Sequence, residues 1–160
     1  MFKVGDRVFC PMRGCGIVEV IEERTMLDKV QEYFIIKIFT GNMTVMVPTD
    51  RISSSRFRPI GDLPTAEAVL STIAEKNVQI DEVIPVKQRF KNNTVKISSG
   101  SLEEYAEVIR DLSHIQKSKP LNAGERSMLM DARKYLVDEI SLIKDVSKDQ
   151  VNCLLDSLLA

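Results

Sequence analysis

Apolar and polar residues alternate along the first 59 residues in a way that predicts β-strands. Residues 14–24 set apolar side chains among glutamates, residues 31–40 are rich in aromatic and β-branched types, and residues 43–48 repeat methionine and valine. A glycine–asparagine pair at residues 41–42 tolerates the positive φ of a tight hairpin between the last two runs. Short strands this close together predict a small, strongly bent sheet or partial barrel.

Helical periodicity replaces the strand pattern after residues 59–64, where proline and glycine cluster. Each later apolar-periodic run is preceded by a residue type that starts helices. The sequence therefore predicts an α+β protein of two modules, with a β module at residues 1–59 and an all-helical module of four or five helices at residues 60–160. The expected helix-start signals are Pro64 with Thr65, Ser101 with Glu104, Asn122 with Glu125, and Ser147 with Gln150.

Charge and composition add few constraints. The chain has 22 basic and 23 acidic side chains, so any binding to nucleic acid has to come from local clusters of charge. No run approaches the roughly 20 apolar residues of a membrane span, and no export signal precedes the first strand pattern. These features predict a cytoplasmic protein with no membrane contact, in which the three cysteines are reduced.

Residues for catalysis are scarce. The single histidine, His114, has no serine or cysteine motif near it and fits the surface of a helix. The chain contains no phosphate-binding glycine loop of the common kinds and no zinc-protease motif. The sequence therefore predicts a protein that is not an enzyme and that uses no cofactor, no metal and no small-molecule substrate.

Cys10 and Cys15 raise three alternatives: packing residues, a metal site, or a thiol-based redox sensor. A structural zinc site needs further soft ligands at short spacing, and only His114 and Cys153 are available, both far along the chain. The four residues between the two cysteines also exclude the C-x-x-C spacing. Packing is favoured, and the flanking Gly14 and Gly16 are interpreted as allowing a tight turn in a bent hairpin.

Two basic segments interrupt the otherwise balanced charge of the helical half. Residues 85–96 carry four basic side chains and no acid, and residues 117–134 carry five against two acids. These segments either converge on a phosphate backbone or form an ordinary solvated face.

A third candidate surface is the strand at residues 44–48. Both of its faces are apolar, so it is either sandwiched in the core or open at a sheet edge to a partner strand. From the residues alone, a core strand is the simpler expectation.

Six segments, in order along nearly the whole chain, form a recognisable pattern. They are "FKVGDRVFCPMRGCGIVEVIEER", "EYFIIKI", "MTVMVP", "QRFKNN", "SSGSLEEYAEVIRDL" and "LNAGERSMLMDARKYLVDEI". Together they resemble the CarD/CdnL family of bacterial transcription regulators. The N-terminal half is similar to the RNA-polymerase-interacting domain that this family shares with the transcription-repair coupling factor.

This resemblance implies a Tudor-like β domain that docks through an exposed edge on the protrusion of the RNA polymerase β subunit. It also implies that the helical module contacts promoter DNA at the upstream fork of the transcription bubble and stabilises the open complex. A monomer is expected. The alternative is a protein-interaction adaptor without direct DNA contact, whose basic segments serve solubility.

The resemblance also implies individual site residues. For polymerase binding they are Arg24, Thr44, Val45, Met46, Val47 and Pro48. For DNA binding they are Val86, Lys87, Arg89, Lys91 and Arg126.

Two positions depart from the family pattern. Met46 replaces an arginine that some members carry, so docking is expected to depend more on strand pairing and apolar contact. Val86 aligns with a tryptophan that many relatives wedge against the fork, and this chain has no tryptophan. Stacking on such a ring contributes roughly 1–3 kcal/mol per base, so weaker stabilisation of the open complex is expected, with Pro85 and Phe90 as candidates to compensate.

Overall fold

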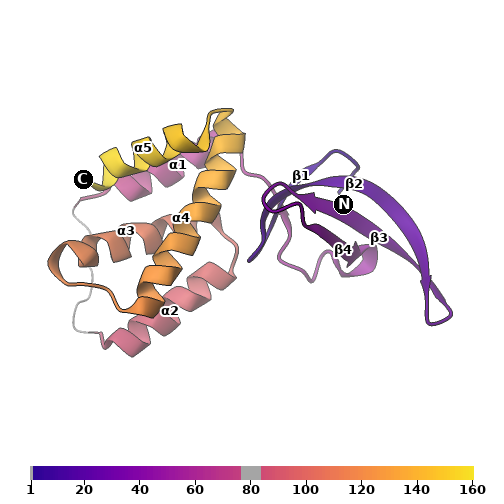
Figure 1. Ribbon diagram of the computed structural model, residues 1–160, viewed down its shortest axis with the longest axis horizontal. Helices are drawn as coiled ribbons and strands as arrows, with labels where there is room; N and C mark the ends of the chain where they lie inside the picture. Colours follow the sequence, from indigo (N-terminus) through magenta and orange to yellow (C-terminus); the bar gives the residue numbers. More distant parts are fainter. Residues whose placement is uncertain (1, 77–83) are drawn as a thin grey trace. The chain divides into compact units, whose positions relative to one another are not determined.

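The computed structural model describes residues 2–76 and 84–160, and the chain divides into two compact units. The first unit is Met1–Ile60 and the second is Gly61–Ala160. The first contains an antiparallel sheet and the second contains helices, which confirms the predicted fold class (Figure 1). Each unit is described below by itself.

The β unit is built on a five-stranded sheet. Its strand order is β4-β3-β2-β1-β5, so consecutive strands pair along most of the sheet, and every pairing is antiparallel. The β2–β3 pair is the longest and extends as a hairpin beyond the other strands (Figure 1). The strands are β1 (Arg7–Cys10), β2 (Gly14–Met26), β3 (Lys29–Ile38), β4 (Thr44–Pro48) and β5 (Arg58–Pro59), with a short 3-10 helix, η1 (Thr49–Arg51), after β4.

One face of this sheet carries the core of the unit. Because successive side chains in a strand point to opposite faces, the alternating buried positions of β3 and β4 identify that face. The flanking segments cover it, and Phe2 meets Phe34 edge to face at 6.1 Å between ring centroids. The buried cluster is Val8, Cys10, Val18, Phe34, Ile36, Ile38, Val45 and Val47.

The two glycines of the first hairpin have different roles. Gly14 has φ +103°, a conformation that L side chains rarely adopt, which fits the predicted turn. Gly16 lies within β2 opposite Val8, where an added Cβ would approach the backbone oxygen of Lys37 to 2.6 Å. The interpretation of Gly16 as a turn residue is therefore wrong, and close approach of neighbouring strands accounts for it.

The strand register separates the two hairpin cysteines. Cys10 pairs with Gly14, whereas Cys15 pairs with Phe9, so their side chains lie on opposite faces of the sheet. Both are buried, and burial raises the pKa of the Cys10 thiol to about 11. This arrangement supports packing and argues against a paired metal or redox site.

Thiol accessibility provides a direct check. With a pKa of about 11, on the order of one in a thousand Cys10 thiols is ionised at pH 8, and the thiolate is the reactive form. We expect a disulfide reagent at pH 8 to modify the exposed Cys153 rapidly and all three thiols only in denaturant. Rapid modification of a second thiol in the folded protein, read by intact mass, would contradict the packing interpretation.

The described residues of the helical unit form five helices, which agrees with the prediction of four or five. One face of α3 (Leu102–Ser118) is buried, as Tyr105, Ile109 and Leu112 are fully enclosed. It packs against α1 and α4, and Leu136 and Ile140 of α4 complete the core. The helices are α1 (Leu63–Ala74), α2 (Val86–Ser98), α3 (Leu102–Ser118), α4 (Ala123–Lys144) and α5 (Lys148–Leu159).

The predicted helix-start residues lie where the helices begin, but they do not all act as predicted. At α1 the cap is Asp62, which accepts the Thr65 N–H at 3.0 Å. At α3 Ser101 accepts the Glu104 N–H at 3.4 Å, while the Ser101 N–H donates to Ser99 and not to Glu104.

Ser147 and Gln150 form a complete capping box at the start of α5. At the start of α4 the Asn122 side chain accepts the N–H of Glu125 at 2.8 Å, but the Glu125 carboxylate bonds instead to Arg89. The cap spacing therefore located the helix and did not show what this carboxylate contacts.

Candidate functional site

The strand at residues 44–48 lies at an edge of the sheet. Among the strands of the described ranges, β4 pairs with β3 alone, from Lys37 opposite Thr44 to Tyr33 opposite Pro48. The expectation of a core strand is therefore wrong, because strand order depends on pairing with distant residues and both faces of an edge strand can still be apolar. Val45 and Val47 face the core, and Met46 lies half-buried on the other face.

The hydrogen-bond register of β4 leaves a row of backbone groups on its outer side. The N–H of Ile38 donates to the carbonyl of Met43 at 2.8 Å, which marks a hydrogen-bonded pair just before β4 begins. Because such pairs alternate along an antiparallel ladder, Val45 and Val47 direct their backbone groups to β3. The N–H and C=O groups of Thr44 and Met46 consequently point away from the sheet, where another strand can pair.

Arg24 lies on the same face of the sheet as Met46. Across β3, Met46 is opposite Ile35, and this register places Glu22 and Arg24 of β2 on the face that lacks the core cluster. Arg24 is half-exposed and donates to Glu22 through Nε at 3.3 Å and Nη2 at 3.1 Å. The arginine is thus held along its strand by an exposed ion pair.

Gln31 connects Arg24 to the end of β4. It lies opposite Arg24 in the register of β2 and β3, and its side-chain amide donates to Asp50 at 3.0 Å. Asp50 belongs to η1, which directly follows Pro48. The register therefore places Arg24 toward the Pro48 end of β4, whereas Thr44 lies at the other end of that strand, opposite Lys37.

The predicted DNA-binding stretch forms the N-terminal half of α2. Val86, Lys87 and Lys91 are exposed, and no residue from Val86 to Asn92 is buried. Phe90 is 39% exposed and is therefore not a core residue. A shallow surface hollow follows this side of the helix, with lysine side chains next to apolar ones, and is lined by Pro85, Lys87, Gln88, Phe90, Lys91, Thr94 and Val95.

Arg89 has a different environment from the neighbouring lysines. Its Nε and Nη2 each donate to the Glu125 carboxylate at 2.8 Å, a bidentate pair between α2 and α4. The Glu125 side chain is 1% exposed and that of Arg89 is 18% exposed. The sequence did not reveal the role of Glu125, because its spacing from Asn122 is explained by a helix cap. Its ion-pair partner, Arg89, lies 36 residues away in the chain.

Arg126 extends the basic surface onto α4. It is exposed in the first turn of that helix, and its Nη1 donates to the backbone oxygen of Leu121 at 2.6 Å. With Lys117 and Lys119 it lines a hollow beside the loop between α3 and α4. Figure 1 shows the start of α4 and α2 at the same end of the helical unit.

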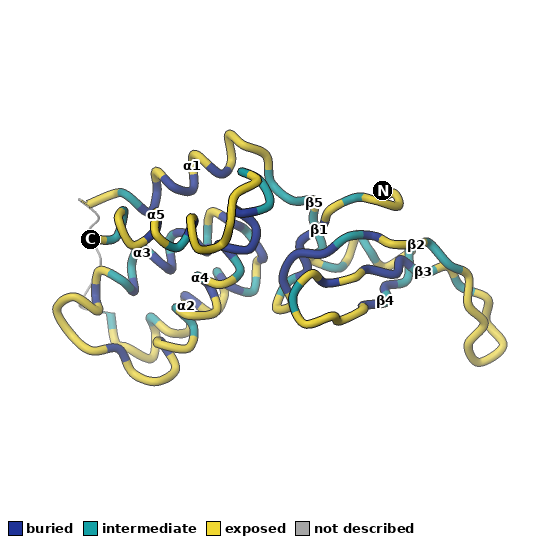
Figure 2. The backbone as a smooth tube through the Cα atoms, turned by 45° about the horizontal axis from the view of Figure 1, so that its top comes forward, coloured by how far each residue is buried: buried dark blue, intermediate teal, exposed yellow. Residues whose placement is uncertain are grey.

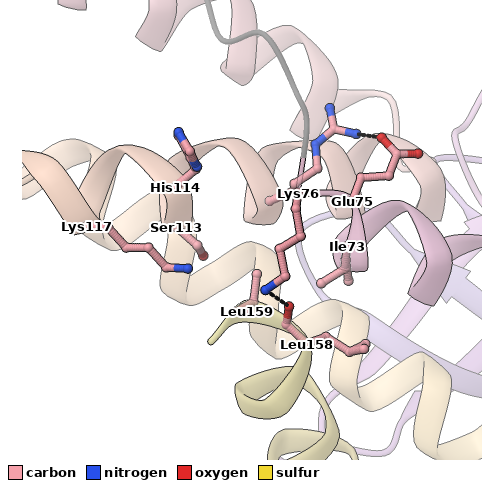
Figure 3. Close-up of a pocket in the computed structure, with 9 residues that line it drawn as sticks. Ile73, Glu75, Lys76, Ser113, His114, Lys117, Leu158 and Leu159 are labelled. Atoms are coloured by element: carbon pink, nitrogen blue, oxygen red, sulfur yellow. Dashed lines mark hydrogen bonds and ion pairs between the residues drawn. The ribbon is translucent and has the colours of Figure 1, made fainter.

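A third hollow lies between α1, α3 and α5 (Figure 3). Its volume of about 40 Å³ is far below the roughly 300–1,000 Å³ of ordinary ligand pockets. Two of its cations already have partners, because Lys76 Nζ donates to the Leu158 carbonyl at 3.3 Å and Arg110 donates to Glu75 at 2.9 Å. His114 contributes to the lining on the surface of α3, as predicted, and the hollow gives no support for catalysis.

The two units therefore define an α+β protein with an open strand edge in one unit and a basic, partly apolar helix surface in the other. Residues 2–61 match the model of the CarD-like/TRCF RID domain, and residues 68–156 match that of the CarD C-terminal domain. The chain belongs to the CarD family of transcription factors, and its role is regulation of transcription.

A curated relative agrees with this assignment. The chain is 41% identical over 151 residues to the protein named "Putative transcription factor YdeB" of Bacillus subtilis (strain 168). The match covers 94% of this chain and 97% of the relative. Within the described ranges, no helix combines the length and apolar character needed to cross a bilayer.

Proposed function

We propose that this protein binds the protrusion of the RNA polymerase β subunit through its β unit and promoter DNA through its helical unit. It acts in the cytoplasm as a monomer, at the upstream fork of the transcription bubble, and stabilises the open complex. The observation that carries the proposal is the coexistence of an open strand edge and an exposed basic helix in the two domains of a CarD family member.

The polymerase contact is assigned to β4 and Arg24. Outward-facing backbone groups at Thr44 and Met46 favour addition of a strand from the partner, which supplies affinity through main-chain hydrogen bonds. Arg24 adds a charged contact on the same face of the sheet, toward the Pro48 end of β4. Because that arginine is exposed and already paired, the main-chain contribution is expected to dominate and to depend little on salt.

The DNA contact is assigned to the start of α2 and the start of α4. Lys87, Lys91 and Arg126 are exposed cations that suit phosphate oxygens, and such contacts position a protein on DNA without reading its sequence. Val86 and Phe90 lie among them as exposed apolar side chains. Arg89 also belongs to this surface, with its guanidinium engaged by Glu125.

Stabilisation of the open complex requires no bond to be made or broken. A bound protein shifts an equilibrium between closed and open promoter only by the difference in its affinity for the two states. The β unit keeps the helical unit at a high local concentration near the fork, since linked sites convert the second binding event into an intramolecular one. The basic helix then needs only a moderate preference for melted DNA.

The lifetime of the open complex tests this function. Purified cognate polymerase holoenzyme is allowed to melt a linear promoter, a competitor is added, and the decay of the complex is followed with and without this protein. We expect a longer lifetime when the protein is present, with an effect that weakens as salt increases. An unchanged lifetime would contradict the proposal, and a longer lifetime without salt dependence would favour the adaptor alternative.

A further inference from the structure

The N-terminal half of α2 is weakly attached to the rest of the helical unit. From Val86 to Asn92 no side chain is buried, and the buried residues of the helix, Asn93 and Ile97, lie further along. The start of this helix therefore has little apolar burial to hold it in place. Through Arg89 and Phe90, this half contacts the first turn of α4.

Two residues in the first turn of α4, Gly124 and Glu125, contact α2. The ring of Phe90 lies over Gly124, where an added Cβ would be only 3.2 Å from Phe90 Cε2. The next residue, Glu125, binds both Nε and Nη2 of Arg89 at 2.8 Å. Asn122 caps the helix by accepting the Glu125 N–H, which fixes the backbone that carries this carboxylate. The contact is therefore specific in geometry and charge.

Resting on the proposed function, we infer that Glu125 is a positioning residue for DNA binding, acting through Arg89 to hold Lys87 and Lys91 in place. Under this inference Arg89 does not contact DNA itself but fixes the position of α2. The phosphate contacts come from Lys87 and Lys91, which flank it. A buried negative charge then favours binding to a polyanion. Simple charge counting predicts the opposite.

The alternative is that Arg89 itself leaves Glu125 and binds a phosphate. The two possibilities differ in the sign of one measurement. Replacing the carboxylate by an amide removes a negative charge and releases the guanidinium, so a phosphate-binding Arg89 gains affinity for DNA. If Glu125 positions α2, the same replacement weakens binding because the bidentate pair is lost.

The experiment measures the affinity of the full-length protein for a fork-junction promoter DNA across a range of salt, with open-complex lifetime as a second readout. We expect Glu125→Gln to weaken DNA binding about tenfold, with a salt slope equal to that of the unaltered protein because the phosphate-binding lysines are retained. Amide hydrogen exchange should accelerate at the start of α2 and stay constant in α3. Increased affinity, or unchanged affinity with unchanged exchange, would overturn the inference.

Glu107→Gln is the matched control. Glu107 also pairs with a cation of α2, Lys96, at 2.9 Å, but at the C-terminal half of the helix and with 32% exposure of both side chains. Both replacements change the net charge by one unit in the same direction. We expect Glu107→Gln to leave DNA affinity within about twofold, since exposed pairs contribute little. An equal loss in both variants would contradict a specific positioning role.

Glu125→Asp covers the case in which the amide variant does not fold. The aspartate retains every charge but is one methylene shorter, so it does not span the same bidentate geometry. A several-fold loss of affinity is expected, and affinity equal to that of the unaltered protein would contradict the inference. If the unaltered protein itself neither binds the DNA nor lengthens the lifetime, the proposed function fails, and this result is distinct from a failure of Glu125 alone.

Discussion

Reversing the charge of Lys87 together with Lys91 should abolish the effect of this protein on open-complex lifetime while leaving its binding to polymerase intact. Both lysines are exposed on the same half of α2, where the described chain offers no exposed acid from Val86 to Lys96. A hydrogen bond to a charged group contributes roughly 1.5–3 kcal/mol, so each reversal should weaken DNA binding by about tenfold or more. The salt slope of DNA binding should also decrease by about 0.9 for each lost phosphate contact.

A lysine outside this surface serves as the control. Lys134 is exposed on α4, two turns beyond Arg126, and Lys134→Glu changes the net charge as much as either single reversal in α2. We expect it to have much less effect than Lys87→Glu or Lys91→Glu on DNA affinity and lifetime. If all three variants lose affinity equally, the contact depends on overall charge and α2 is not a specific DNA-binding element.

The reversal in α2 also separates the two functions that the family membership suggests. An adaptor that binds only proteins would tolerate the change, because its contacts with polymerase lie in the β unit. A DNA-stabilising regulator would bind polymerase normally and fail only in the lifetime assay. Pull-down of the β protrusion and open-complex decay, measured on the same preparation, therefore distinguish these functions.

Local signals account for the part of the fold that could be predicted. Helix starts depend on residues three positions apart, and Ser101, Asn122 and Ser147 each accept the N–H of the third residue that follows. Hairpins are similarly local, and Gly41 and Asn42 both adopt positive φ at the expected turn. Such features are encoded within a few residues of chain, so pattern reading finds them.

Contacts between distant residues account for what was missed. β4 has the composition of a buried strand, and its place at the edge depends on which strands pair across the whole unit. Glu125 has the spacing of a capping residue, and only packing of α2 on α4 shows that its carboxylate binds Arg89. Gly16 likewise reflects the approach of Lys37 from another strand. Local pattern gave no signal for any of these three pairings.

The site residues came from the resemblance to the family, and the structure adds how they are grouped. Arg24 and Met46 are far apart in sequence and share one face of the sheet because the intervening strand keeps them in register. Lys87 and Arg126 are brought to one end of the helical unit by the contact of α2 with α4. Figure 2 shows that the exposed positions run along α2 and over the β2–β3 hairpin.

Met46→Pro should weaken polymerase binding without unfolding the β unit. The Met46 N–H points away from β3, so proline removes a donor that an added strand would use and spares the existing ladder. Proline is tolerated at such positions of edge strands. A lost hydrogen bond of roughly 0.5–1.5 kcal/mol, together with an unpaired carbonyl on the partner, should weaken binding by about tenfold or more in a pull-down or by interferometry.

Met46→Val separates the backbone from the side chain. Valine keeps the N–H and suits a strand, so polymerase binding should change by no more than about threefold if main-chain pairing dominates. Thermal unfolding of each variant shows whether the β unit stays folded. Thr44→Pro, at the first residue of the strand, is a second test of the backbone groups that point away from β3. Normal binding by both proline variants would exclude strand addition at this edge and leave the face around Arg24 as the docking surface. Loss of binding in the proline variants alone would instead show that the partner pairs with the backbone of β4, and this mode of docking needs no arginine at position 46.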